Sequence, residues 1–372
     1  MAASKNLENI NFEFGFNLEY LKSLNKSFED FNWNQHERFL NTFKHYRTEL
    51  EGIDLHFLRH DFPLKKGQQK IPILLMHGFG SSFWDFYKII PVLSNPTRFG
   101  YDFGGNGKQI VFDVIVPSLP GFGFSEAPIK PGLGSIQSAR IFGKLMERIG
   151  HEKYFVHGSS VLGSQIASNL ALIRPKNVLG IHLANPFFDF EANLVAKIKW
   201  FSSKILKQGF NDLKIPRNID SFERPDTYGL SFASSSFSAT CFLFDRWAKG
   251  INHPKWKHHP QGGLQSHNTV DELITEAHIF WLSENSANSL RFLHFSENDS
   301  FKNDFEKATI TIPTGILLTP RTPHITTQFY YSHKFEKIIQ FFEAENGGEF
   351  VAIENSELLA KEIFSFVELV LI

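Results

Sequence analysis

The sequence predicts an α/β protein with a mostly parallel, doubly wound sheet, and three observations carry this prediction. Short continuous apolar runs recur between helical segments, as expected of strands that are buried on both faces. This alternation stops near residue 185 and returns after residue 288. The length of 372 residues is sufficient for one large domain with an insertion, or for two domains.

Residues 1–60 contain many aromatic side chains but few continuous apolar runs. We expect an extended arm with short helices that packs on another part of the molecule. Within it, apolar and polar residues alternate along 50–57 around a turn, and this pattern predicts a hairpin. Residues 1–11 lack the apolar stretch of a secretory signal.

The first part of the core, residues 61–185, contains the first set of strand signals. We expect strands at 71–76, 112–116, 154–157 and 178–183, and helices at 82–93, 138–149 and 165–173.

Residues 186–288 favour a helical lid, with helices at 192–207, 238–247 and 270–282. Residues 289–372 return to the core pattern, with a strand at 308–318, a strand or short helix at 337–342 and an amphipathic helix at 357–370. A sheet interrupted by a helical lid is the architecture of the α/β-hydrolase fold.

Composition excludes several classes of function. The net charge of −1 gives no reason to expect a nucleic acid partner. A single cysteine, Cys241, excludes an internal disulfide and fits a reducing compartment such as the cytoplasm. No run approaches the roughly 18 apolar residues of a membrane span. His258 and His259, with His253 or His267, lack the spacing of a metal site, and we predict no metal and no cofactor.

Three motifs resemble the epoxide hydrolases of the microsomal and juvenile hormone type. Residues 77–86 read His-Gly-Phe-Gly-Ser-Ser-Phe-Trp-Asp-Phe, where that family has His-Gly-Trp-Pro-Gly-Ser, and residues 112–125 are almost the family signature. Residues 347–350 read Gly-Gly-Glu-Phe, where the family has Gly-Gly-His-Phe. The resemblance covers nearly the whole chain, and it implies an N-terminal meander and a lid over an α/β-hydrolase core.

The resemblance also implies a reaction. An Asp opens the epoxide through an ester intermediate, two lid tyrosines bond the epoxide oxygen, and a His oriented by a carboxylate activates water. At the turn that carries the Asp, alignment from the N-terminal side places Ser160 at the Asp position. Alignment back from Gly163 places Val161 there. Neither alignment supplies a carboxylate, and the turn is one residue longer than in the family.

The other positions implied by the resemblance are also replaced. Thr322 stands at the carboxylate position and Glu349 at the His position. Arg217 and Leu293 are the nearest counterparts of the lid tyrosines. The loop His77-Gly78-Phe79-Gly80 corresponds to an oxyanion-type loop, and its glycines are equally typical of a tight turn after a buried strand.

We therefore predict a catalytically impaired or inactive homologue that keeps a lid-covered pocket for an apolar epoxide, diol, terpenoid or lipid. One alternative is an active epoxide hydrolase with a rearranged site, in which Glu349 acts as the base. Another is a serine esterase that uses Ser160, with His157, His324 or His333 as its base. We expect a cytoplasmic location, with peripheral attachment to the endoplasmic reticulum membrane as the alternative; no oligomeric state is predicted.

Overall fold

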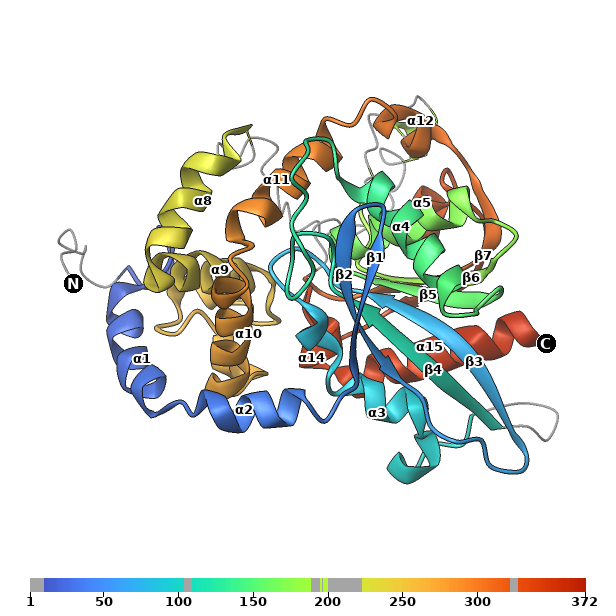
Figure 1. Cartoon of the computed structure of the whole chain (residues 1–372), viewed down its shortest axis with the longest axis horizontal. Coiled ribbons are helices and arrows are strands. Elements are labelled where there is room, and N and C mark those ends of the chain that lie inside the picture. Colours follow the sequence, from blue (N-terminus) through green and yellow to red (C-terminus); the bar gives the residue numbers. More distant parts are fainter. Residues whose placement is uncertain (1–9, 104–108, 189–194, 196, 200–222, 322–326) are drawn as a thin grey trace.

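An eight-stranded sheet forms the centre of the molecule in the computed structural model, which describes residues 10–103, 109–188, 195, 197–199, 223–321 and 327–372 (Figure 1). The strand order is β1-β2-β4-β3-β5-β6-β7-β8. The strands are β1 (His45–Leu50), β2 (Ile53–His60), β3 (Gln68–Met76), β4 (Gln109–Pro117), β5 (Tyr154–Ser159), β6 (Val178–Ala184), β7 (Ile310–Leu318) and β8 (Phe335–Glu343).

The pairing within the sheet is mostly parallel. Strand β1 pairs antiparallel with β2, and β2 pairs antiparallel with β4. The six strands β4, β3, β5, β6, β7 and β8 run parallel to one another. Every residue of β4 after Gln109 is buried, as expected of a strand that helices cover on both faces. The carboxyl ends of β5, β6, β7 and β8 therefore meet at one edge of the sheet.

Helices cover both faces of the sheet (Figure 1). One face carries α4 (Ser135–Arg148) and α5 (Ser160–Ile173), and the other carries α3 (Ile89–Ser94) and α15 (Ser356–Leu371). Alternate residues of β3 divide between the two layers: Leu75 joins the cluster beneath α15, whereas Leu74 and Met76 join the cluster beneath α4 and α5. The fold predicted from the sequence is confirmed.

Three lid helices, α8 (Pro225–Ser234), α9 (Ser236–Gly250) and α10 (Val270–Leu282), follow β6 in the chain and lie beside the sheet (Figure 1). The N-terminal helices α1 (Leu18–Asp30) and α2 (Trp33–Leu40) lie along them. Phe16 contacts Phe244 of α9, and His278 of α10 stacks on both Phe31 and Trp33. The aromatic residues of the arm are thus used to hold the lid.

The remaining described elements are short or connect the lid to the core. They are η1 (Phe83–Phe86), η2 (Pro96–Phe99), η4 (Trp256–His258), η5 (Leu264–Ser266), α11 (Ser286–Glu297), α12 (Lys302–Lys307), α13 (Gln328–Tyr331) and α14 (Val351–Glu354).

The structure corrects several of the predicted elements. The helix expected at 82–93 is two pieces, η1 and α3, because the missing N–H of Pro91 is tolerated in the first turn of a helix and not in its middle. Helix α5 begins at Ser160, five residues before the predicted start. Helix α11 was not predicted at all, whereas segment 337–342 is a strand, β8, which is one of its two predicted alternatives. Most of the helix expected at 192–207 lies outside the described residues.

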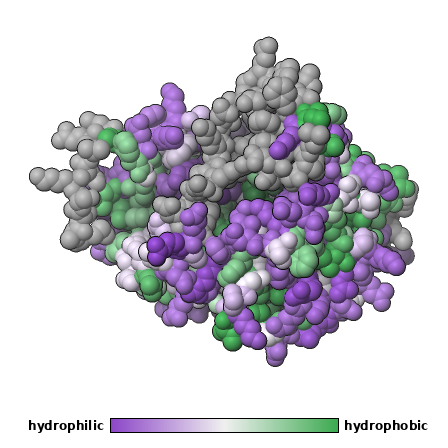
Figure 2. Space-filling view, turned by 90° about the horizontal axis from the view of Figure 1, so that it is seen from above, coloured by the Kyte–Doolittle hydropathy of each residue, from purple (hydrophilic) through white to green (hydrophobic). Residues whose placement is uncertain are grey.

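The surface in Figure 2 mixes polar side chains with small apolar areas. Within the part of the chain that the structure describes, no helix has both the length and the apolar run needed to cross a membrane.

Candidate active site

Ser160 occupies the sharp turn between β5 and α5. Its φ is 60°, in the left-handed region that side-chain-bearing residues rarely adopt. Such a strained turn between a strand and a helix is where α/β-hydrolases hold their nucleophile. Val161, the residue after Ser160 in α5, has no positive φ. Of the two sequence alignments, the geometry favours the one that places Ser160 at the nucleophile position.

Three glycines permit this turn. A Cβ on Gly163 would lie 2.5 Å from the carbonyl oxygen of Met76, and a Cβ on Gly158 would collide with the backbone of Gly163. A Cβ on Gly78 would lie 2.6 Å from the Cβ of Ser160. The small residue that such a turn requires is therefore three places after Ser160, because the turn is one residue longer than usual. Leu162 stands two places after Ser160, where the usual turn has its small residue, and is buried in the core.

The hydroxyl of Ser160 faces Glu349 and not a histidine. Ser160 Oγ donates a hydrogen bond to Glu349 Oε1 at 2.5 Å, and the same oxygen is ion-paired with Arg246 Nη2 of the lid helix α9. Ser160 and Glu349 are 2% and 4% exposed. Two of the predicted positions, Ser160 and Glu349, are thus in contact. Arg246 joins them, and no sequence motif pointed to this residue.

The loop that carries Glu349 is fixed by residues at the ends of β6 and β7. Asn185 Nδ2 and Thr319 Oγ1 both donate to the carbonyl oxygen of Gly348, at 3.0 Å and 2.9 Å. The backbone N–H of Glu349 donates to the carbonyl oxygen of Gly250, the last residue of α9. Glu349 is therefore held from the core and from the lid.

Helix α9 is docked on the same loop by a second side chain. Trp247 stacks on Phe350, with ring centroids 4.7 Å apart, and its Nε1 donates to the carbonyl oxygen of Gly80 at 2.6 Å. Gly80 has a φ of 83°, so the tight turn needs a glycine there. The guanidinium of Arg246 also lies 5.4 Å above the Phe350 ring.

The predicted oxyanion-type loop lies directly beside Ser160 and has a clear structural role. His77 is fully buried, and burial lowers its pKa to about 4, so its ring is neutral at pH 7. His77 Nε2 accepts the N–H of Leu119 at 3.2 Å, which leaves Nδ1 to donate to the carbonyl oxygen of Gly78. Phe79 of this loop is buried and packs near Phe242 of α9.

Two further carboxyl groups lie close to Glu349. Burial raises the pKa of Asp85 in η1 to about 7, and the charge of Glu349 adds to this effect. Burial raises the pKa of Glu354 to about 8, although backbone N–H groups of Asn252 and Phe350 bond to it. Asp85 lies within the motif at 77–86 and Glu354 lies four residues after the motif at 347–350, but only the structure shows that they face one site.

Neither of the two described histidines that were suggested as a base is bonded to Ser160. His157 Nε2 lies 2.9 Å from Ser159 Oγ, and its Nδ1 lies 3.0 Å from the Nδ1 of His182. Burial lowers the pKa of His157 well below its usual range. His333 bonds to the carbonyl oxygen of Tyr330, and His324 lies outside the described residues.

Only one of the other three predicted positions, Leu293, lies in the described part of the chain. Leu293 of α11 packs in the apolar cluster beneath α4 and α5. Thr322 and Arg217 lie outside the described residues.

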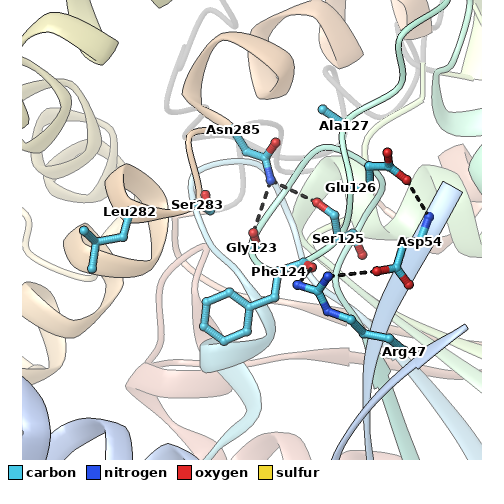
Figure 3. Close-up of a pocket in the computed structure, with 10 residues that line it drawn as sticks. All are labelled: Arg47, Asp54, Gly123, Phe124, Ser125, Glu126, Ala127, Leu282, Ser283 and Asn285. Atoms are coloured by element: carbon cyan, nitrogen blue, oxygen red, sulfur yellow. Dashed lines mark hydrogen bonds and ion pairs between the residues drawn. The ribbon is translucent and has the colours of Figure 1, made fainter.

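A surface recess of about 560 Å³ lies elsewhere, between the β1–β2 hairpin, the loop after β4 and the end of α10 (Figure 3). Its polar groups are bonded to one another: Arg47 pairs with Asp54, and Asn285 donates to the carbonyl oxygens of Gly123 and Ser125. We therefore assign no ligand to it.

Comparison with known proteins agrees with this geometry. Residues 2–86 match the family described as "Epoxide hydrolase N terminus", and residues 71–227 match the alpha/beta hydrolase fold. Juvenile hormone epoxide hydrolase 2 of Ctenocephalides felis is 32% identical over 382 aligned positions, which cover 97% of this chain and 79% of that protein. Epoxide hydrolase 1 of Sus scrofa is 31% identical and covers 98% of this chain and 83% of its own length.

A solved structure is similar as well. The juvenile hormone epoxide hydrolase from the silkworm Bombyx mori superposes with a TM-score of 0.85 at 26% identity, over 99% of this chain and 88% of that chain. The fold and the strained turn at Ser160 define an α/β-hydrolase. Within that class, the chain belongs to the epoxide hydrolase family of the microsomal and juvenile hormone type, as the sequence motifs predicted.

Proposed function

We propose that this chain is a family member that does not open epoxides by the family's reaction and that binds an apolar small molecule beneath its lid. The observation that carries the proposal is the group Ser160–Glu349–Arg246, which stands where the reaction needs an Asp and a His.

The nucleophile position argues against epoxide opening. A carboxylate attacks in its ionised form, which is abundant at neutral pH, whereas a serine hydroxyl must lose its proton to a base. The group that accepts the hydrogen bond from Ser160 is the carboxylate of Glu349. A carboxylate is a weak base, with an unperturbed pKa of about 4.3. The oxygen that accepts this bond is already ion-paired with Arg246.

The second step of the reaction lacks its base too. Glu349 stands at the position of the histidine that would activate water, and no described histidine bonds to Ser160. Residues of one catalytic unit fail together, so replacing several members leaves little of the rate enhancement.

Turnover of styrene oxide and stilbene oxide by the purified protein tests this proposal. We expect no diol above the buffer background, and the same result for Ser160→Ala and Glu349→Gln. Diol formation at an ordinary enzymatic rate that is lost in Ser160→Ala would show that the rearranged site is active.

Ligand binding supplies the second half of the proposal. Relatives named as juvenile hormone epoxide hydrolases suggest an apolar ligand, and the lid helices place apolar rings such as Phe242 against the loop beside Ser160. Thermal shift with matched pairs of apolar epoxides and their diols measures this. A concentration-dependent rise in melting temperature is expected, and a flat response across the panel would remove the support for a ligand.

Ester hydrolysis is the second candidate, because Ser160 keeps the backbone geometry of a serine nucleophile. A p-nitrophenyl ester assay distinguishes it. Equal rates for the wild-type protein and Ser160→Ala would eliminate this candidate, and a rate that depends on Ser160 would establish it.

A cytoplasmic location is part of the same proposal, supported by the free Cys241 of α9. Burial raises the pKa of this thiol to about 11, so it is unreactive at neutral pH. Fractionation with protease protection tests the location, and recovery with the endoplasmic reticulum membrane would favour the peripheral alternative.

A further inference from the structure

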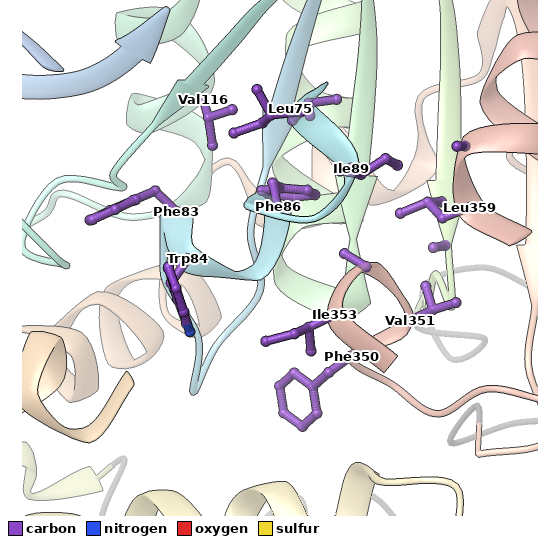
Figure 4. Close-up of a cluster of buried hydrophobic side chains, with 14 of the residues drawn as sticks. Leu75, Phe83, Trp84, Phe86, Ile89, Val116, Phe350, Val351, Ile353 and Leu359 are labelled. Atoms are coloured by element: carbon purple, nitrogen blue, oxygen red, sulfur yellow. The ribbon is translucent and has the colours of Figure 1, made fainter. Parts of the chain in front are cut away.

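The C-terminal end of lid helix α9 rests on a small group of carboxyl side chains. Glu349 and Glu354 belong to the loop and short helix after β8, and Asp85 belongs to η1. Elements η1 and α14 pack on each other through a shared apolar cluster, in which Phe86 and Ile353 are fully or almost fully buried (Figure 4). This packing brings the three carboxyl groups into one enclosed region.

The carboxyl of Glu354 joins the lid to the core. Its Oε2 accepts the N–H of Asn252, just after α9, at 3.0 Å, and its Oε1 accepts the N–H of Phe350 at 3.2 Å. A Cβ on Gly348 would collide with this carboxyl, so the contact depends on glycine there. A change in the charge of Glu354 therefore acts on the hydrogen bond that Asn252 donates just after the end of α9.

The cations near this group are already engaged. Arg246 is paired with Glu349. Arg321 faces Glu354, and its guanidinium donates to the carbonyl oxygens of Ile251 and His253.

Two more charged groups complete the surroundings on the other packed elements. Lys88 of the segment before α3 pairs with Glu272 of α10 and donates to the carbonyl oxygen of Ile353. Glu276 of α10 faces Asp85, and burial raises the pKa of Glu276 well above its usual range. Among the described residues, Asp85 Oδ1 has no hydrogen-bond partner although Asp85 is 1% exposed.

These surroundings favour the neutral form of the carboxyls. Burial is the main cause that raises the pKa of Glu354 to about 8 and that of Asp85 to about 7, and the neighbouring carboxylates act in the same direction. The protons are held by the group as a whole, because its members interact.

We propose that the contact between the end of α9 and the core is a proton-dependent clamp, closed while Glu354 holds its proton and loosened as that proton leaves. The physical reason is that an ionised Glu354 would stand beside Glu349 and Asp85, while Arg321, the cation that faces it, has its guanidinium bonded to backbone carbonyl oxygens. The new charge would then be stabilised by water entering the seam. The inference does not depend on whether the chain is catalytically active.

The sign of the effect follows from the two states. In the open state Glu354 is hydrated and loses its proton above a pKa of about 4.3. In the closed state it keeps the proton until pH is about 8. The equilibrium constant for opening should therefore rise with pH between these values, by at most about tenfold per pH unit, and level off above pH 8.

Hydrogen exchange followed by mass spectrometry from pH 5.5 to 9 tests the clamp, after correction for intrinsic exchange rates. We expect the protection of the peptide that covers residues 236–252 to fall by at least about tenfold up to pH 8 and then to stay level. The peptide that covers β4, residues 109–117, should keep its protection and serves as the internal reference.

Two variants sharpen the test. Glu354→Gln keeps the shape of the side chain and one of its two acceptor oxygens but cannot ionise, so the protection of α9 should start lower, at a constant offset, and its pH dependence should flatten. Glu345→Gln removes an exposed carboxylate from the same loop and should behave like the wild-type protein. Constant protection of α9 in the wild-type protein, or an equal loss in α9 and β4, would overturn the clamp, even if Glu354→Gln does not fold.

Discussion

At the scale of single residues, the side chains at the replaced positions bond to each other and to an arginine. Ser160, Glu349 and Arg246 form a continuous chain of hydrogen bonds from the turn between β5 and α5, here called the elbow, to helix α9. A carboxylate this buried is stable only when it is paired and bonded. The group therefore explains why the positions can be replaced without loss of the fold.

A double-mutant cycle on Glu349 and Arg246 measures this interaction. Removing either side chain by alanine should lower the free energy of unfolding by about 1–3 kcal/mol, because it leaves the partner charge in a poorly hydrated place. The double variant should lose less free energy of unfolding than the two single variants lose together, by at least about 1 kcal/mol. Urea denaturation gives the three values, and strict additivity would show that the pair is not coupled.

At the scale of elements, the turn between β5 and α5 shows what sequence alone can and cannot give. The strands were predictable because they are continuous apolar runs between Gly-rich turns, as in Ile71–Met76. The start of α5 was not, because Ser160 takes a strained φ that no propensity encodes. Helix α11 was missed because its polar residues mask its buried ones.

The candidate site divides in the same way. Glu349 could be placed from its motif, whereas the motif around the turn left Ser160 and Val161 as alternatives, because its two sides give different alignments. Arg246 could not, because its role depends on where α9 lies relative to the sheet, and this is set by packing between distant segments. The same holds for Asp85 and Glu354, whose shifted pKa values arise from burial that only the fold creates.

Glycine substitutions test the geometry of the elbow. Gly163→Ala should lower the free energy of unfolding by about 3 kcal/mol or more, because the new methyl group meets the backbone of Met76. Gly100→Ala is the matched control: it has a positive φ of 80° but open space around it, so only about 1 kcal/mol of backbone strain is expected. Equal losses in chemical denaturation would contradict the close approach.

At the scale of the whole molecule, buried ionisable groups set the pH range in which the fold is stable. Burial lowers the pKa of His56 and His182 to about 3 and that of His77 to about 4. Below about pH 6.5 the unfolded chain takes up protons on these rings and the folded chain does not, so stability falls with acid by up to about 1.4 kcal/mol per pH unit and group.

The raised carboxyl pKa values act in the other direction. Asp85 and Glu354 keep their protons in the folded chain up to about pH 7 and 8, whereas the unfolded chain loses them near pH 4. Stability should therefore fall as pH rises from about 6.5 to 8. Melting temperatures followed by circular dichroism should peak near pH 6 to 6.5, and Glu354→Gln should flatten the alkaline side. A wild-type curve that rises steadily from pH 6.5 to 8.5 would contradict this assignment.

The fold is that of the epoxide hydrolase family, while the groups that meet at the turn between β5 and α5 are a hydroxyl, a carboxylate and a guanidinium. A single-turnover experiment tests most directly whether these groups open epoxides. Protein in excess over stilbene oxide is followed by diol analysis and by intact mass, with Ser160→Ala as the control. The account predicts neither diol nor covalent adduct, and an adduct on the peptide that contains Ser160, or a burst of diol lost in Ser160→Ala, would contradict it.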